Sequence, residues 1–453
     1  MNNTFFTARK SIKNYANGGN ILIASTILAL ILVNIPQLTE FYNSLWTHEI
    51  ALQVGNFNLF SHNGHPLNII QFINDALMAI FFLQIGLEIK REILVGELSS
   101  FRQALLPIVA AIGGMVVPVS IFFLIGRGSN FIDGAAIPMA TDIAFSLGVL
   151  AMLGSRVPIS LKIFLTTLAV VDDIGGILVI AIFYSSEINF TMLLIAAALF
   201  IVLLFGSKLK IQSKVFYLGI GAFIWFLFMN AGIHPTIAGV LIAFCVPAKP
   251  VYAPKGYIQT IHENIKHFES DDISDKETKT ILNKQQLNWL KEIESASDKV
   301  ISPLQDLEDS LHPIVNYIIV PLFAFANAGI FLGDLDAASV FQGVSLAIIA
   351  GLVIGKFVGI FSFTWLCIKL KLAPKPEKSN WKMIAGVSML GGIGFTVSLF
   401  IANLSFGGDP QYAEILNNAK LGIIVGSLIA GILGYLFLHI SLPKQTENSS
   451  NKS

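Results

Sequence analysis

The stretch "LAVVDDIGGILVI", residues 168–180, places two adjacent aspartates, Asp172 and Asp173, at the centre of an apolar run. Such a run predicts a helix that crosses a membrane, where an aspartate at the helix centre costs about 2.5–3.5 kcal/mol. The fourteen Leu, Ile, Val and Phe residues of 161–184 contribute about 0.3–0.6 kcal/mol each, so insertion is marginal. The helix therefore carries two carboxyls only if they face partners or a water-filled cavity. Adjacent helix positions point about 100° apart, so the two aspartates need different partners.

The whole chain has the composition of a polytopic membrane protein. Of its 453 residues, 54% are hydrophobic and 13% are charged, against about 25% charged residues in an ordinary soluble domain. Apolar runs long enough to cross the hydrocarbon core recur along the chain and predict an all-α fold with about twelve transmembrane helices. The predicted runs are 20–37, 67–89, 104–126, 135–153, 161–184, 191–206, 215–230, 236–248, 313–332, 341–368, 383–404 and 419–441.

Charge and cysteine content narrow the class further. The formal net charge is zero, so nothing indicates a nucleic-acid partner. Cys245 and Cys367 lie far apart in apolar runs, and we interpret them as buried small hydrophobic residues, not as a disulfide or a metal site. The segment before the first run is polar, so no cleavable signal peptide is expected.

The positive charges predict the orientation. With the N-terminus inside, all but three of the 29 Lys and Arg residues fall in inside segments. This bias predicts that both termini are cytoplasmic. The same topology divides the chain into helices 1–8 at 1–248, a cytoplasmic polar insert at 249–311, helices 9–12 at 312–441 and a cytoplasmic tail at 442–453.

Two polar segments carry patterns of their own. Residues 51–60, on the outside, alternate apolar and polar around a Gly-Asn pair, which favours a small hairpin over an irregular loop only slightly. Within the insert, the leucines of 280–294 have helical spacing and predict a short soluble helix.

Further charges and helix breakers lie within predicted spans. Asp142 follows Thr141 in the fourth run, with Pro138 just before them, and Lys356 is the only basic residue deep in any predicted span. Pro138 and the glycine-rich stretch 391–394 predict one broken helix in each half of the chain. Paired broken helices are typical of a transporter whose binding site lies at the membrane midplane, and their dipole ends need opposite charges.

A structural role is the alternative for each of these residues. A single intramembrane aspartate is often a structural hydrogen-bond partner, but three aspartates, a lysine and two broken spans together favour a functional site. Structural and functional roles are equally open for Asp75, near the middle of the second run. Glu88, Arg91 and Glu92 lie one turn apart at a predicted helix end, which favours a solvated ion-pair cluster. His234 falls in a predicted outside loop.

Five long segments of the chain can be compared with known families: "PMATDIAFSLGVLAMLGSRVPISLKIFLTTLAVVDDIGG", "NDALMAIFFLQIGLEIKRE", "PLFAFANAGI", "GLVIGKFVGI" and "GGIGFTVSLFIA". Together they resemble the NhaA family of bacterial sodium/proton antiporters, and the resemblance spans nearly the whole chain except the termini and the insert. The resemblance implies inverted repeats and two broken helices that cross at the midplane.

The resemblance also implies roles for the intramembrane residues. Asp173, Asp142 and Thr141 would bind the transported Na⁺. Asp172 would pair with Lys356, and these two with Asp173 would carry out the exchange of proton and ion.

Regulation is implied for a second set of residues. Glu88, Arg91, Glu308 and His312 would sense pH at the cytoplasmic side. His234 matches a histidine that the family links to pH response, and Pro235 follows it here. The 51–60 hairpin would be a dimer contact. The long insert is the main departure from the family, and the resemblance implies nothing about its role.

The function expected from the residues and the resemblance is electrogenic, pH-regulated antiport. Cytoplasmic Na⁺ or Li⁺ would leave the cell in exchange for external protons, through a homodimer in the lipid of the bacterial inner membrane. The chain would not be an enzyme and would need no cofactor. The alternative is a sodium-coupled organic solute symporter of similar fold, although no sequence feature identifies a solute pocket. An intramembrane aspartyl protease is a poorer fit, because the adjacent aspartates diverge and no GxGD sequence occurs.

Overall fold

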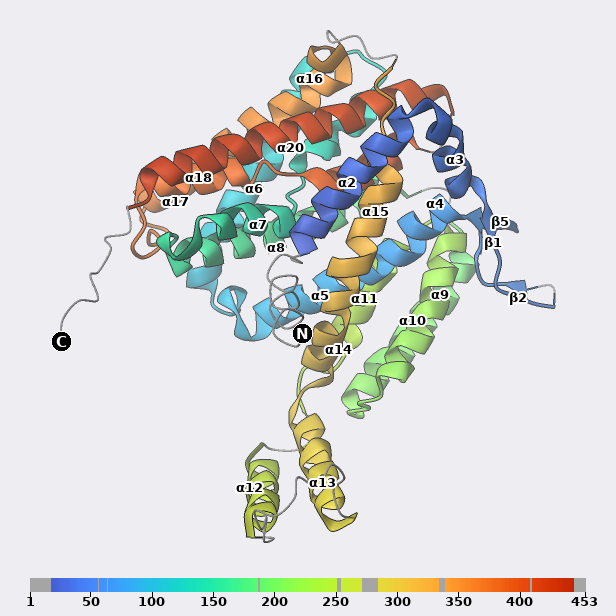
Figure 1. Cartoon of the computed structure of the whole chain (residues 1–453), viewed down its shortest axis with the longest axis vertical. Coiled ribbons are helices and arrows are strands. Elements are labelled where there is room, and N and C mark those ends of the chain that lie inside the picture. Colours follow the sequence, from blue (N-terminus) through green and yellow to red (C-terminus); the bar gives the residue numbers. More distant parts are fainter. Residues whose placement is uncertain are drawn as a thin grey trace, which may run out of the picture.

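The computed structural model of the chain describes residues 18–55, 57–62, 64–185, 188–250, 254–270, 284–333, 339–407 and 410–443. The predicted N-terminal segment before residue 18, most of the tail and the start of the predicted 280–294 helix lie outside these residues. Almost everything described is helical (Figure 1).

Within the described residues, nine spans are long and apolar enough to cross a membrane. Two bent helix pairs add two more, and the short helix α11 (Thr236–Cys245) corresponds to the eighth predicted run. The twelve predicted runs therefore each find a counterpart. The nine spans are α4–η1–α5 (Ile69–Gln71, Phe72–Leu77, Met78–Val95), α6 (Phe101–Ile125), η3–α7 (Ile132–Met139, Ile143–Met152), α8 (Ile159–Phe183), α9 (Phe190–Lys208), α10 (Lys214–Ala231), α14–η5–α15 (Pro303–Ile314, Val315–Ile319, Val320–Asn327), α16–η7–α17 (Gly343–Ala350, Gly351–Gly355, Lys356–Lys369) and α20 (Ala413–Ser441).

The bent pairs are α2–α3 (Gly18–Asn34, Pro36–Thr47), which turns by 117°, and α18–α19 (Trp381–Leu390, Phe395–Phe406), which turns by 42°. Short 3₁₀ turns join several spans: η2 (Glu97–Ser99), η4 (Gly154–Arg156), η6 (Ser339–Phe341) and η8 (Pro410–Tyr412).

The two predicted broken helices are confirmed. The first breaks between η3, which contains Pro138, and α7, and the second breaks at 391–394 between α18 and α19. α7 begins where the Asp142 side chain accepts a hydrogen bond from Phe145 N at 3.0 Å, which satisfies one of its free N–H groups.

The two breaks satisfy each other's backbone. Asp142 N donates to Ile393 O at 2.6 Å, and Ser398 Oγ donates to Ile137 O at 2.8 Å. In a membrane, where no water is at hand, extended backbone persists only with such partners. Contact between the breaks therefore lets two irregular segments lie deep in the protein.

The broken helices occupy matching places in two three-span units. α6 precedes and α8 follows the first break, as α16–α17 precede and α20 follows the second. Seven crossings separate the start of one unit from the start of the other, so the two units run in opposite directions through the membrane. This is the inverted repeat that the resemblance implied.

Close packing of α6 against α17 fixes the depth of Lys356. A Cβ atom on Gly359 would lie 2.1 Å from Gly113 O, and one on Gly113 would lie 2.4 Å from Gly359 O. Only glycine permits this approach of two helix backbones.

Lys420, which hydropathy placed at a span edge, is also buried. It lies two turns into α20, because this helix begins at Ala413, before the apolar run starts.

Five short strands lie at one edge of the molecule (Figure 1). β2 (Gln53–Val54) pairs antiparallel with β3 (Phe57–Asn58), which confirms the predicted hairpin at 51–60. β5 (His65–Asn68) pairs on either side with β1 (Glu49–Ile50) and β4 (Ser61–His62) to form a three-stranded sheet that the sequence did not predict.

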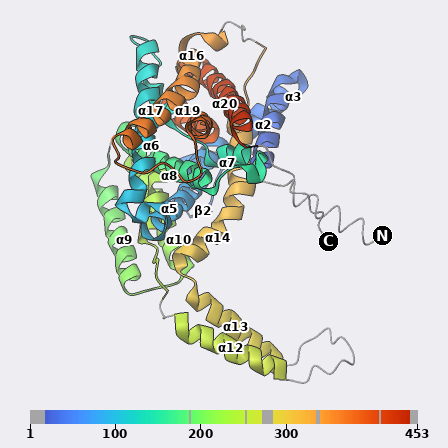
Figure 2. The same ribbon diagram turned by 90° about the vertical axis from the view of Figure 1, so that its left-hand side faces the viewer.

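The polar insert forms two helices, α12 (Pro254–Ser270) and α13 (Lys284–Val300), which pack together and project from the membrane helices (Figures 1 and 2). α13 confirms the predicted helix, although it extends further than 294. The ninth span begins at Pro303, earlier than the predicted 313, because Ser302 caps it through Gln305 N. Leu304 N donates to Pro247 O at 3.1 Å, so the two ends of the insert meet.

Candidate functional site

Lys356 and Asp172 form an ion pair in the interior. Both side chains are fully inaccessible to solvent, and Lys356 Nζ contacts Asp172 Oδ2. Thr141, in the first break, completes the cluster: its hydroxyl lies 3.0 Å from Lys356 Nζ and 2.7 Å from Asp172 Oδ2. The structure therefore brings together the predicted pair and adds the hydroxyl of Thr141 to it.

The π-helical turn η7 ends directly before Lys356. Such turns contain a wider backbone loop and occur often at functional sites. Together with the Gly113–Gly359 contact, η7 aims the lysine at the broken segment of the neighbouring helix.

Asp142 lies in the same break but has other partners. Its Oδ1 accepts Phe145 N, and its Oδ2 accepts both Thr396 N at 3.1 Å and Thr396 Oγ1 at 2.6 Å. Because Phe145 lies in the first turn of α7 and Thr396 in the first turn of α19, this carboxylate joins the N-terminal ends of two half-helices. The positive ends of both helix dipoles point toward this carboxyl group.

Asp173 has neither an ion pair like that of Asp172 nor hydrogen bonds like those of Asp142. The structure gives its carboxylate no hydrogen bond within the described residues, although the residue is only 6% exposed. It lies on the wall of a cavity of about 280 Å³, which Asp142, Thr141 and Thr396 also line. The adjacent aspartates therefore face different surroundings: Asp172 faces a lysine and Asp173 faces open space.

The cavity extends from Asp173 to the four residues that the resemblance linked to pH. Glu88, Arg91, Glu308 and His312 all line it, at the end of the protein where α13 leads into α14. Arg91 forms an ion pair with Glu308 and lies 4.0 Å from Glu88.

Glu92, which is 3.2 Å from Arg91, belongs to the same cluster. It also accepts Glu97 N at 3.1 Å, which ties the cluster to the start of η2.

Beyond Asp173 the protein is closed. The space there is about 10 Å³, lined by Phe82, Ile177, Ile180 and Val397 among others, and such a space barely holds one water molecule. Further out, Phe400 packs against Phe82 and against the His234 ring.

Three amide side chains cross this closed side, of which Asn327 is fully buried and Asn74 and Asn403 are partly buried. Asn327 Nδ2 donates to Asn74 Oδ1 at 2.9 Å and Asn403 Nδ2 donates to Asn327 Oδ1 at 2.9 Å, which links η1, α15 and α19. The cavity therefore reaches Asp173 from one end only.

His234 is not the simple loop residue that its predicted position indicated. It is part of the closed side, with its Nε2 3.8 Å from Asp75 Oδ1 and its Nδ1 2.7 Å from Thr236 Oγ1. Burial lowers the pKa of His234 to about 3. The ring is therefore neutral at physiological pH, and its contact with Asp75 is not an ion pair with a charged imidazole.

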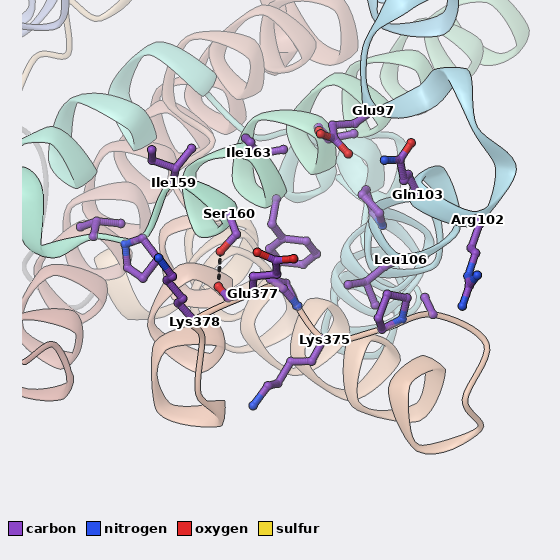
Figure 3. Close-up of a pocket in the computed structure, with 18 of the residues that line it drawn as sticks. Glu97, Arg102, Gln103, Leu106, Ile159, Ser160, Ile163, Lys375, Glu377 and Lys378 are labelled. Atoms are coloured by element: carbon purple, nitrogen blue, oxygen red, sulfur yellow. Dashed lines mark hydrogen bonds between the residues drawn. The ribbon is translucent and has the colours of Figure 1, made fainter.

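A larger cavity, about 830 Å³, lies elsewhere between α6, α8 and the loop before α18 (Figure 3). Arg102, Lys375, Glu377 and Lys378 lie around its edge. Its charges are those of exposed loops and helix ends, and none of the buried acids lines it. Size alone is therefore a poor guide to the site in this protein.

Sequence reasoning missed Gln84 and Thr396, both on the wall of the smaller cavity. Each is a polar residue inside an apolar run, which is a weak signal compared with a charge. The Asn74–Asn327–Asn403 contact was missed because the three residues are far apart in the sequence.

The described residues contain no cluster of three or more His, Cys, Asp or Glu side chains of the kind that holds a resident metal. Two broken helices that cross beside buried acids, with a cavity that reaches the acids from one end, define a cation-coupled secondary transporter.

Comparison with known proteins specifies the transporter. The family described as Na+/H+ antiporter 1 matches residues 9–438. The chain is 54% identical to the Na(+)/H(+) antiporter NhaA of Phocaeicola vulgatus over 98% of each chain. It is also 54% identical to that of Bacteroides fragilis strain ATCC 25285 over 97% of this chain and 100% of the relative. The Na(+)/H(+) antiporter NhaA 2 of Helicobacter hepaticus is 44% identical over 93% of each chain.

The chain belongs to the Na+/H+ antiporter 1 family and is a Na⁺/H⁺ antiporter. The alternative of an organic solute symporter finds no support in these relatives.

Proposed function

We propose that Asp173 is the group at which sodium and protons compete. The observation that carries this proposal is the position of Asp173, a buried carboxyl without a hydrogen bond on the wall of the cavity. Burial disfavours an unpaired carboxylate, so the group binds either a proton or a cation. Asp142 and Thr141 adjoin it on the cavity wall and exchange their present hydrogen bonds for the cation as it enters.

The Asp172–Lys356 pair has the second role in this proposal. It neutralises two charges within the protein and holds the first break against α17. The second proton of each cycle is exchanged at this pair, so that two protons enter for each sodium ion that leaves. Each cycle then moves one net charge, and an inside-negative potential favours sodium exit by about 2.3 kcal/mol per 100 mV.

The cluster at the cavity mouth regulates access in the proposal. Glu88, Arg91, Glu308 and His312 combine two carboxylates, a guanidinium and an imidazole, and protonation of a carboxylate removes its attraction to the guanidinium. Protonation would loosen the Arg91–Glu308 ion pair, which joins α5 to α14. The insert helix α13 leads into α14, so the insert can bias this pair.

The lysine and arginine distribution supports cytoplasmic termini, with the cavity mouth and the insert on the same side of the membrane. In this orientation the closed side faces outward. We place the protein in the bacterial inner membrane as a homodimer through the 51–60 hairpin, with Li⁺ as a second transported ion and lipid around the spans.

Exchange by the purified protein in proteoliposomes tests the proposed function. Asp173→Asn should abolish sodium-dependent proton efflux while leaving the folded yield unchanged. Wild-type exchange by this variant would remove Asp173 from the site. Generation of a membrane potential during exchange tests the stoichiometry, since electroneutral exchange would contradict it.

A further inference from the structure

One wall of the cavity carries an amide side chain, Gln84, that takes no part in the ion pairs or in the contacts between the broken helices. Gln84 interrupts the apolar run of α5 and is only 6% exposed. Its Oε1 is buried without a hydrogen-bond partner, and the described residues provide no partner for its Nε2 either. An amide removed from water without a hydrogen bond is unfavourable, so its retention in an apolar helix calls for a ligand.

Gln84 faces the proposed ion site. It lines the same cavity as Asp173, Asp142 and Thr396. Asp142 already uses both oxygens on Phe145 and Thr396. The Asp173 carboxylate and the Gln84 amide oxygen, by contrast, need give up no hydrogen bond to hold a cation.

The amide can present its oxygen without losing any contact. A half-turn of the terminal group exchanges the oxygen and the nitrogen, which have nearly the same shape. Because the described residues fix neither atom by a hydrogen bond, the half-turn breaks none. The oxygen then faces the cavity on the α5 side, while Asp173 approaches from α8.

We propose that Gln84 Oε1 is a neutral ligand of the transported cation, and this inference rests on the proposed role of Asp173. A second carboxylate at this position would hold a proton as well as a sodium ion. An amide binds sodium but takes up no proton in the physiological range. Gln84 therefore strengthens the binding of sodium without strengthening the binding of the competing proton. This makes it a specificity-determining residue.

This role predicts a distinct pH signature. Sodium and proton compete at Asp173, so the KM for sodium rises below the pH at which Asp173 takes up a proton. Gln84→Met keeps the length and shape of the side chain but removes the oxygen. It should raise the KM about tenfold at every pH. This is the effect expected from the loss of one interaction as strong as a hydrogen bond to a charged group. The pH at which the KM begins to rise should stay unchanged.

Gln84→Glu is the second variant, since it keeps an oxygen but adds a proton site. It should retain a low KM at alkaline pH, and its KM should begin to rise at a different pH from that of the wild type. Thr364→Val is the matched control: Thr364 also has a buried, unpartnered oxygen, but it does not line the cavity. Its KM should equal that of the wild type. Exchange is measured with Na⁺ and with Li⁺ in proteoliposomes across a pH series.

The outcomes separate this inference from the proposed function. A wild-type KM in Gln84→Met, with Asp173→Asn inactive, overturns the ligand role of Gln84 and leaves Asp173 in place. Full exchange by Asp173→Asn overturns both. If Gln84→Met does not fold, Gln84→Glu decides the question, because an unchanged pH profile of its KM contradicts an oxygen at the ion.

Discussion

Thr396 donates two hydrogen bonds to Asp142 Oδ2, one from its hydroxyl at 2.6 Å and one from its backbone amide at 3.1 Å. This contact joins the starts of α7 and α19, which lie in different halves of the chain. A single carboxylate thus holds the two broken helices in register.

Loss of the Thr396 hydroxyl should loosen this junction. Thr396→Val leaves Asp142 Oδ2 with only the backbone donor. The loss of one hydrogen bond to a buried polar group costs about 1–3 kcal/mol. We expect a lower melting temperature in detergent and a higher KM for sodium. Thr396→Ser keeps the hydroxyl and should restore both. Equal behaviour of the valine and serine variants would contradict a junction role.

Lys356→Ala should destabilise the protein more than a neutral replacement of the whole pair. The single change leaves Asp172 buried without its cation, which typically costs about 3–5 kcal/mol. The double variant Asp172→Asn with Lys356→Gln leaves no buried charge. Melting temperatures compare the two, and the same melting temperature for both would argue against a buried ion pair.

His234 should make the protein less stable in mild acid. Its pKa is about 3 in the folded protein, against about 6.5 in the unfolded chain. Above pH 6.5 the ring is neutral in both states. As the pH falls from 6.5 toward 3, only the unfolded chain takes up the proton, and each unit costs about 1.4 kcal/mol.

His234→Gln should therefore flatten the fall in melting temperature between pH 6.5 and 4. Asp75 is the charged group nearest to the ring, so Asp75→Asn is tested alongside to separate its own titration. A slope that His234→Gln leaves unchanged would mean that the ring is protonated in the folded protein.

Asn327→Leu should weaken the closed side. Asn327 bonds both Asn74 and Asn403, so its loss unlinks three elements at once. Ile177→Cys, placed beyond Asp173 in a background without Cys245 and Cys367, reports access to this region. An impermeant thiol reagent is added from the side of the membrane on which the five short strands lie. It should label this cysteine faster in the Asn327→Leu variant. Asn316→Leu, at the cavity mouth, is the control, and equal labelling in the two variants would show that the amides do not keep this side closed.

Glu308→Gln should shift the pH dependence of exchange, because it removes the charge that pairs with Arg91. The KM for sodium at the optimal pH should change little. Replacement of residues 254–300 by a short linker should also move the profile if the insert acts on α14. An unchanged profile in both proteins would reduce the cluster to an interfacial anchor and leave the insert without a regulatory role.

Much of the fold could be predicted because hydrocarbon imposes a simple rule on sequence. Spans need long apolar runs, so all twelve were visible, and Pro138 and the glycines of 391–394 marked the breaks. The Asp172–Lys356 pair could be predicted because the predicted spans contain few charged residues that could pair with each other. The span boundaries at Pro303 and Ala413 could not be predicted, because polar first turns and caps do not register in hydropathy.

The finer parts of the site depend on how helices cross. Gln84 and Thr396 can be recognised as site residues only from the structure, in which α5 and α19 line the same cavity. Thr141 lines the cavity with Asp173, and its hydroxyl also bonds Lys356 and Asp172, which the sequence did not predict. Which side of a broken segment a hydroxyl faces is set by the local backbone, and a linear pattern does not record it.

The hydrogen bond from Leu304 to Pro247 bears on how this protein tolerates foreign sequence. Because the chain leaves and re-enters the membrane helices at touching points, anything placed between them is a closed loop whose ends are already held. Doubling the length of such a loop costs only about 0.6 kcal/mol. A folded reporter domain whose own termini lie close together could replace α12 and α13 without pulling on α11 or α14. That position would give electron microscopy a rigid fiducial on a transporter that otherwise offers little mass outside the bilayer.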